Sequence, residues 1–183
     1  MGLDYSFVTV IHDHYRDKLF EYIKKHGTLS YGDCACIHFE MDSFILKYLE
    51  GGYDWTPHYD KTRVEEYIEP DGKARIGCIY ISVRELEGTN KEIEVSFTAA
   101  TTDMSLLFKD SVSISRWFIT LSKELNSIIT YIDLESEGIR IIYCKGLELR
   151  LELNGGEYHL SELSKSFLDI IKEFSVRYRH FEE

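Results

Sequence analysis

The chain has 183 residues, a formal net charge of -11 and 44% hydrophobic residues. This length can bury one sizeable core, so we expect a single domain over residues 1–183. Its 21 basic residues stand against 32 acidic ones, which argues against nucleic acid as a partner because phosphate binding needs clustered Lys and Arg. The sequence has no run of about 18 apolar residues and no secretory signal at its start, so we expect a cytoplasmic protein with no membrane partner.

The period of the apolar residues predicts strands alternating with helices along the chain. β-branched and aromatic residues with a period of two are typical of strands, whereas apolar residues three and four positions apart are typical of helices. The predicted strands lie at residues 5–11, 33–40, 74–83, 92–98, 127–135, 138–144 and 147–153. The predicted helices lie at residues 13–26, 42–49, 111–125 and 160–178, with another short helix before residue 70.

This order of elements favours an α+β fold with a mostly antiparallel sheet and helices packed on one face. The order β-α-β-β recurs, so the chain has possible pseudo-repeat halves, 1–90 and 91–183, each with a βαββ-like arrangement. Alternation also predicts which side chains face the helices. In two strands we expect the apolar side chains to pack on the helices and the charged ones to face water; the apolar sets are Ile93, Val95 and Phe97, and Leu147, Leu149, Leu151 and Leu153.

The stretch DCACIHFE, residues 33–40, sets Cys36 and His38 on one face of a predicted strand together with Cys34. In the strand at 74–83, Cys78 and Tyr80 share the corresponding face. Free cysteine is among the most buried residue types, so we expect this face to be covered. The natural cover is the aromatic-rich segment 42–73, which leaves one strand and returns to the other.

All four cysteines are predicted to be reduced thiols. A chain of this size does not need a disulfide framework, and Cys34 and Cys36 on one strand are poorly placed to pair. A structural zinc site brings its sulfurs close together, whereas same-face residues of a strand lie about 7 Å apart. We therefore expect no cofactor and no metal, although Cys78 and His58 could still close a site around the strand.

No residue type in this sequence stands in a recognisable catalytic arrangement. A cysteine nucleophile needs a base within hydrogen-bond reach, and His38 is too far from Cys36 on a regular strand. The sequence also lacks a nucleophile elbow around any Ser and a Gly-rich phosphate loop. The sequence favours a non-catalytic protein, and no catalytic residue is predicted.

The segment GGYDWTPHYD, residues 51–60, has the composition of a recognition surface. It combines rigid aromatic side chains with polar and acidic groups after a pair of glycines, as partner-binding surfaces do. Its candidate binding residues are Tyr53, Asp54, Trp55, His58 and Tyr59. The alternative is that these aromatic side chains fold inward and pack as part of a lid.

Three hypotheses of function follow from these features. The first is a non-catalytic binding or protein-interaction module that uses residues 51–60, with a protein or small molecule of unknown identity as partner. The second is a small-molecule sensor with a cleft between the two halves, and the third is a cysteine- or metal-dependent hydrolase. In the sensor the floor of the cleft comprises Cys36, His38, Cys78 and Tyr80. An exposed aromatic patch would favour the first, an enclosed cavity of several hundred Å³ the second, and a thiol of lowered pKa beside a histidine the third.

Overall fold

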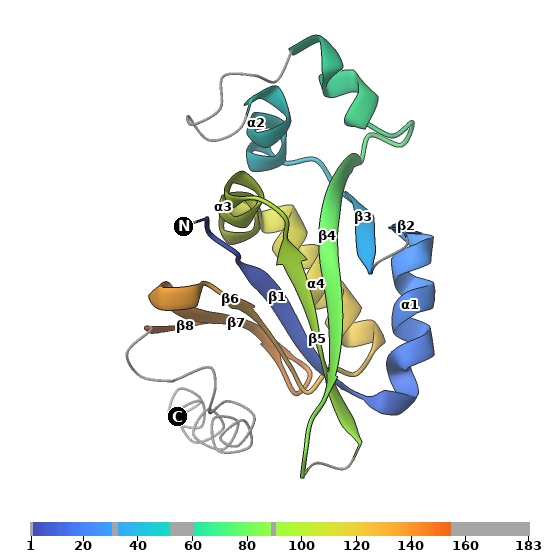
Figure 1. Cartoon of the computed structure of the whole chain (residues 1–183), viewed down its shortest axis with the longest axis vertical. Helices are drawn as coiled ribbons and strands as arrows, with labels where there is room; N and C mark the ends of the chain where they lie inside the picture. Colours follow the sequence, from blue (N-terminus) through green and yellow to red (C-terminus); the bar gives the residue numbers. More distant parts are fainter. Residues whose placement is uncertain (1, 31–32, 52–60, 89–90, 155–183) are drawn as a thin grey trace.

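The computed structural model describes residues 2–30, 33–51, 61–88 and 91–154. Its described strands form one eight-stranded sheet in the order β2-β3-β4-β5-β1-β6-β7-β8, in which every neighbouring pair is antiparallel. Four α-helices accompany the sheet in the described part of the chain (Figure 1). The predicted α+β class with an antiparallel sheet is therefore confirmed.

The elements follow the predicted order closely. The strands are β1 Ser6–His12, β2 Gly27–Ser30, β3 Cys34–Phe39, β4 Ala74–Glu85, β5 Glu92–Ala99, β6 Ile129–Asp133, β7 Gly138–Cys144 and β8 Leu147–Asn154. The α-helices are α1 Arg16–Lys25, α2 Ser43–Gly51, α3 Thr102–Asp110 and α4 Val112–Glu124. Short 3-10 helices are η1 Asp13–Tyr15, η2 Lys61–Tyr67 and η3 Glu135–Glu137.

The main core lies between one face of the sheet and the helices. The Phe7 ring of β1 stacks on Phe118 of α4 with ring centroids 4.1 Å apart, and Phe97 of β5 meets Phe118 edge-on at 5.0 Å. Buried side chains from α1, α2 and α3 join the same core, so the expectation of helices on one face is confirmed. Serine and threonine caps begin two of these helices: the side chain of Thr101 accepts from Met104 N, and that of Ser111 accepts from Ile114 N.

A second apolar cluster lies on the opposite face of β1, β6, β7 and β8. On β1, Val8 belongs to this cluster whereas its neighbour Phe7 belongs to the main core, because successive strand residues face opposite ways. The predicted orientation of β8 is therefore wrong. Its inner leucines pack in the second cluster, and Glu148 on the other face pairs with Lys123 of α4. Alternation identifies residues that share a face but does not say which face meets the helices.

The two halves of the chain are interlocked in the sheet. Strand β1 lies between β5 and β6, so a strand from residues 1–90 is flanked on both sides by strands from residues 91–183. Helix α1 then returns the chain from β1 to β2 at the edge of the sheet (Figure 1). Because β4, β5, β1 and β6 are joined by continuous hydrogen bonding, the sheet is not divided between the halves.

Among the described strands and α-helices, β2 and α3 were not predicted. The predicted helix at 160–178 lies outside the described residues. Within the described ranges, none of the helices has the length and apolar character needed to cross a membrane.

Candidate functional site

The sheet contains an irregularity where β3 meets β4. Ala35 pairs with Ile79 and Ile37 pairs with Ile76, so Cys36 on β3 stands opposite two residues of β4, Gly77 and Cys78. This is the arrangement of a β-bulge, a feature that re-aims side chains and is common beside functional sites. The bulge also brings Cys36 against Gly77: a Cβ built on Gly77 would lie only 3.0 Å from Cys36 Cβ. Any other residue at position 77 would force Cys36 to move.

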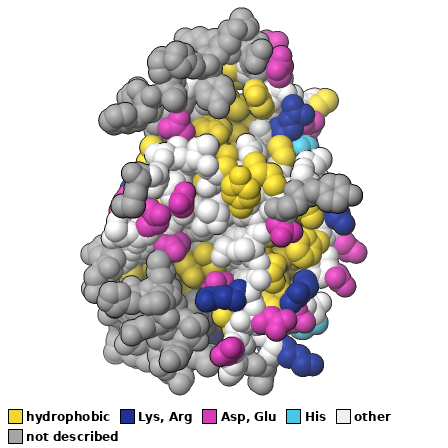
Figure 2. All heavy atoms as spheres, viewed as in Figure 1, with side chains coloured by type: hydrophobic (Ala, Val, Ile, Leu, Met, Phe, Trp, Pro, Cys, Tyr) yellow, Lys and Arg dark blue, Asp and Glu magenta, His cyan; other side chains and the backbone are white. Residues whose placement is uncertain are grey.

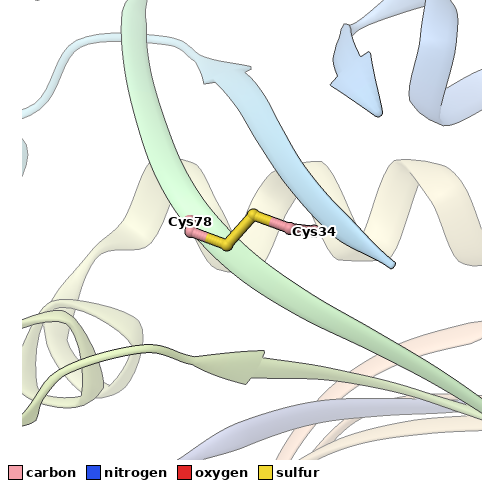
Figure 3. Close-up of a disulfide and its surroundings, with 2 residues drawn as sticks. All are labelled: Cys34 and Cys78. Atoms are coloured by element: carbon pink, nitrogen blue, oxygen red, sulfur yellow. A yellow bond between two sulfur atoms is a disulfide. The ribbon is translucent and has the colours of Figure 1, made fainter. Parts of the chain in front are cut away.

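A disulfide joins β3 to β4 next to the bulge. It links Cys34 to Cys78 (Figure 3), and their Cα atoms lie 5.7 Å apart. Cys36 and Cys144 are free. The prediction that all four cysteines are reduced is therefore wrong. That prediction compared cysteines within one strand, whereas the bond connects different strands whose pairing could not be derived from the sequence. Disulfides are typical of oxidising compartments, so this bond does not support the predicted cytoplasmic location. That location stays a prediction.

A pocket of about 270 Å³ opens at the bulge. The three cysteines of β3 and β4 line it together with side chains from β2, α2 and η2. Its described lining residues are Ser30, Cys34, Cys36, Tyr48, Leu49, Tyr67, Arg75, Ile76, Gly77 and Cys78. Two tyrosine rings of the segment 42–73 thus share a pocket with the cysteine face. The described lining lies within residues 30–78, rather than in a cleft between the two halves.

Asp42 holds one wall of the pocket in place. One carboxylate oxygen accepts from Ile45 N at 2.8 Å and caps α2, while the other accepts from Ser111 Oγ at 2.7 Å and Ser113 N at 3.0 Å, at the start of α4. Burial alone would raise the pKa of Asp42, but the hydrogen bonds from Ile45, Ser111 and Ser113 outweigh it and hold that pKa below its usual value. Through Asp42, the helix carrying Tyr48 is fixed to the helix that covers the main core.

Arg75 supplies a positive charge at the pocket. Its guanidinium donates to the backbone carbonyl of Glu66, and its Nη1 lies 3.6 Å from a carboxylate oxygen of Glu69. The same carboxylate oxygen of Glu69 lies 3.8 Å from Nε2 of His38. A guanidinium has five N–H donors, so Arg75 can make these contacts and still donate to a bound group.

The surroundings of the free thiol in the pocket disfavour its ionisation. Burial raises the pKa of Cys36, the nearby Arg75 guanidinium opposes this rise, and Glu69 adds to it. Burial likewise raises the pKa of Cys144 in the second apolar cluster. A nucleophilic cysteine needs a lowered pKa, so burial of these two thiols does not favour the cysteine-dependent form of the hydrolase hypothesis.

The structure separates the predicted floor residues into two groups. Cys36 and Cys78 line the pocket, whereas His38 and Tyr80 do not belong to its described lining. Tyr80 is 52% exposed, so the cysteine face is open at this end rather than covered. The predicted binding residues Tyr53, Asp54, Trp55, His58 and Tyr59 all lie outside the described residues.

Arg75 and Ile76 are pocket residues that the sequence reasoning missed. If β4 were a regular strand, alternation from Cys78 would place Ile76 on the cysteine face and Arg75 on the core face. The extra residue of the bulge reverses this order, so Ile76 is buried in the core and Arg75 is exposed on the cysteine face. Gly77 is the one local signal, since a glycine inside a strand often marks a bulge.

The described part of the chain contains no concentration of metal-ligating groups. Among the side chains that the structure describes, no three His, Cys, Asp or Glu residues lie close enough to hold a metal ion. Figure 2 shows acidic side chains scattered over one face of the molecule, with hydrophobic side chains reaching the surface in its middle and upper parts.

Comparison with known proteins yields no relative for this chain. No protein-family model, no curated protein and no solved structure matches it.

Proposed function

We propose that this protein is a non-catalytic binding module whose pocket at the β3–β4 bulge takes a small, mostly apolar molecule carrying a hydrogen-bond acceptor. The observation that carries this proposal is the pocket lining, where two tyrosine rings and a guanidinium converge on a cysteine-lined floor. Binding pockets typically combine apolar and aromatic walls with a few polar groups that orient the ligand.

The size and walls of the pocket favour a ligand of one or two rings. Its volume of about 270 Å³ exceeds that of a cavity of about 150 Å³ that holds benzene, and lies near the lower end for small-molecule sites. Leu49, Tyr48 and Tyr67 offer apolar and aromatic surface. Arg75 would donate to an acceptor such as a carboxylate, a sulfonate or a carbonyl oxygen.

A fluorescence titration with 2-naphthalenesulfonate tests this proposal, because the probe combines two fused aromatic rings with an anionic acceptor. Ser30 lies at the rim of the pocket and is exposed, so Ser30→Trp should fill the entrance without disturbing the core. We expect this variant to bind the probe at least roughly tenfold more weakly than the wild type.

Ser82→Trp is the matched control. Ser82 is an exposed serine of β4, four positions after Cys78 on the same sheet face, and does not belong to the described lining of the pocket. It should leave probe binding unchanged. Equal affinity for the probe in the wild type and in both variants would contradict the proposal, since the probe would then bind elsewhere.

Native mass spectrometry of the purified full chain would identify a natural ligand. The ligand would appear as an extra mass that is lost on unfolding. If the fraction of protein carrying this mass falls in Arg75→Gln but not in Arg84→Gln, the ligand binds at the pocket. Arg84 is a suitable control because it lies on the same strand and pairs with Glu94 away from the pocket.

A further inference from the structure

Cys78 can reach two partners on β3. The register places Cys36 directly opposite the bulge formed by Gly77 and Cys78, whereas Cys34 pairs with Tyr80 and reaches Cys78 diagonally. Residues directly opposite in an antiparallel pair have Cα atoms about 4.5–5.5 Å apart, which lies within the range of about 4.4–6.8 Å found in disulfides. The existing bond, with Cα atoms 5.7 Å apart, thus uses one of two feasible partners.

Cys36 also has its sulfur on the correct side of the strand. Its Sγ would lie 3.1 Å from a Cβ built on Gly77, so the thiol lies over the backbone of the residue that precedes Cys78. Cys34, Cys36 and Cys78 all line the same pocket. One free thiol therefore lies beside one disulfide in a space that solvent reaches.

We propose that Cys34, Cys36 and Cys78 form a thiol–disulfide exchange centre in which Cys78 is the shared sulfur. The Cys36 thiolate attacks Cys78 Sγ, a new Cys36–Cys78 bond forms, and the Cys34–Cys78 bond breaks. Its electron pair leaves on Cys34, which takes up a proton, so the step needs no oxidant or reductant. The result changes which cysteine presents a free thiol to the pocket.

The surroundings of Cys36 keep this exchange slow at neutral pH. The attacking species is the thiolate, and burial raises the pKa of Cys36 despite the nearby guanidinium. The charged or titratable groups around the thiol are Arg75 of β4, Glu69 after η2, Tyr48 of α2, Tyr67 of η2 and His38 of its own strand. Exchange should therefore accelerate as the pH rises past the ordinary cysteine value of about 8.5.

Alkylation mapping of the wild-type protein tests the exchange. The native chain is incubated below and above this pH, quenched by acidification, unfolded without reductant and alkylated in mildly acidic buffer with N-ethylmaleimide, because exchange needs the thiolate and is suppressed there. The alkylated sites are then located by peptide mass spectrometry. Label begins on Cys36 and Cys144, and we expect Cys34 to gain label at high pH while Cys36 loses the same amount. Label that remains on Cys36 at every pH would overturn the proposal.

Two variants separate internal exchange from attack by an outside thiol. Cys36→Ser should show no label on Cys34 at any pH, whereas Cys144→Ser, which removes the distant free thiol, should exchange like the wild type. In Cys34→Ser, oxidation in a glutathione buffer should leave Cys144 as the free thiol, because Cys36 bonds to Cys78. If Cys36 and Cys78 both remain free thiols in that variant, Cys78 does not bond to Cys36, and the proposal is contradicted. None of these results depends on a ligand, so they stand apart from the binding proposal.

Discussion

Strand β4 has two neighbours and pairs with them in different ways. With β5 it keeps one register from Ile79 to Glu85, and the inward side chains of both strands pack in the main core. With β3 the register shifts at Cys36, and the result is a bulge, a disulfide and a pocket. The difference indicates that regular pairing stabilises the fold, whereas the irregular pairing provides the space and the side chains of the pocket.

Truncating the core on the regular side should have the largest effect. Phe118 is fully buried and packs against Phe7, Phe97 and Trp117. We expect Phe118→Ala to lower the free energy of unfolding by roughly 3–5 kcal/mol, measured by urea denaturation. Tyr80→Ala on the exposed face of β4 should change it by less than about 0.5 kcal/mol. A similar loss in both variants would show that burial does not distinguish the two faces of the sheet.

Removing the disulfide should weaken the irregular side. The bond joins residues separated by 44 positions, so Cys78→Ser should cost roughly 2–4 kcal/mol of unfolding free energy. Dithiothreitol should lower the stability of the wild type by a similar amount and leave the variant unchanged. Thiol titration of the unfolded wild type should find the two free cysteines before reduction and all four afterwards. Four reactive thiols without reductant would mean that the bond does not form.

Asp42 links the two sides, because it connects the pocket helix α2 to the core helix α4. Asp42→Ala removes acceptors used by Ile45, Ser111 and Ser113, and we expect a loss of roughly 2 kcal/mol. The exposed carboxylate of Asp17 provides the control, since Asp17→Ala should change stability by less than about 0.5 kcal/mol.

The pH dependence of the Asp42 contribution has a definite sign. Because the folded-state pKa of Asp42 is lowered, its stabilisation is present above the unfolded value of about 3.9 and is lost as the pH falls through the folded pKa. The stability difference between the wild type and Asp42→Asn should therefore shrink in acid. A difference that stays constant from neutral pH down to below the pKa would assign the effect to shape rather than charge.

The smallest effect should come from a surface ion pair on the regular side. Arg84 Nη2 lies 3.0 Å from both carboxylate oxygens of Glu94 on β5. Arg84→Gln should cost about 0.5–1 kcal/mol at low salt and less at high salt. The more exposed pair of Arg150 and Glu152, 3.6 Å apart, should give an effect near zero in Arg150→Gln. Equal, salt-independent losses in both variants would point to packing by the arginine side chains.

The sequence predicted the regular side of the molecule better than the irregular side. Alternating residues identified β5 and its inward face, and helical spacing identified α4, because both patterns depend on neighbouring residues. Helix α3 was missed although Met104, Leu107 and Phe108 have helical spacing and Thr101 stands at the cap position.

The pocket could not be predicted in the same way, because it depends on which strands are neighbours. The Cys34–Cys78 bond requires β3 beside β4 in a particular register, and the exposure of Arg75 requires the bulge. No local pattern encodes such pairing. Only the position of Gly77 inside a strand, together with the cysteines around it, marked the place where regular alternation would fail.

The position of β1 has a consequence for how the chain reaches its native state. Strand β1 precedes the other described strands in the chain and pairs with β5 and β6, so it has no partner in the sheet until residues up to 99 have been made, and its second partner is complete only at residue 133. Contacts between segments so distant in the chain generally slow folding. We therefore expect the apolar side chains of β1 to remain exposed on the nascent chain at least until β5 has been synthesised, and chaperones can bind them during that time.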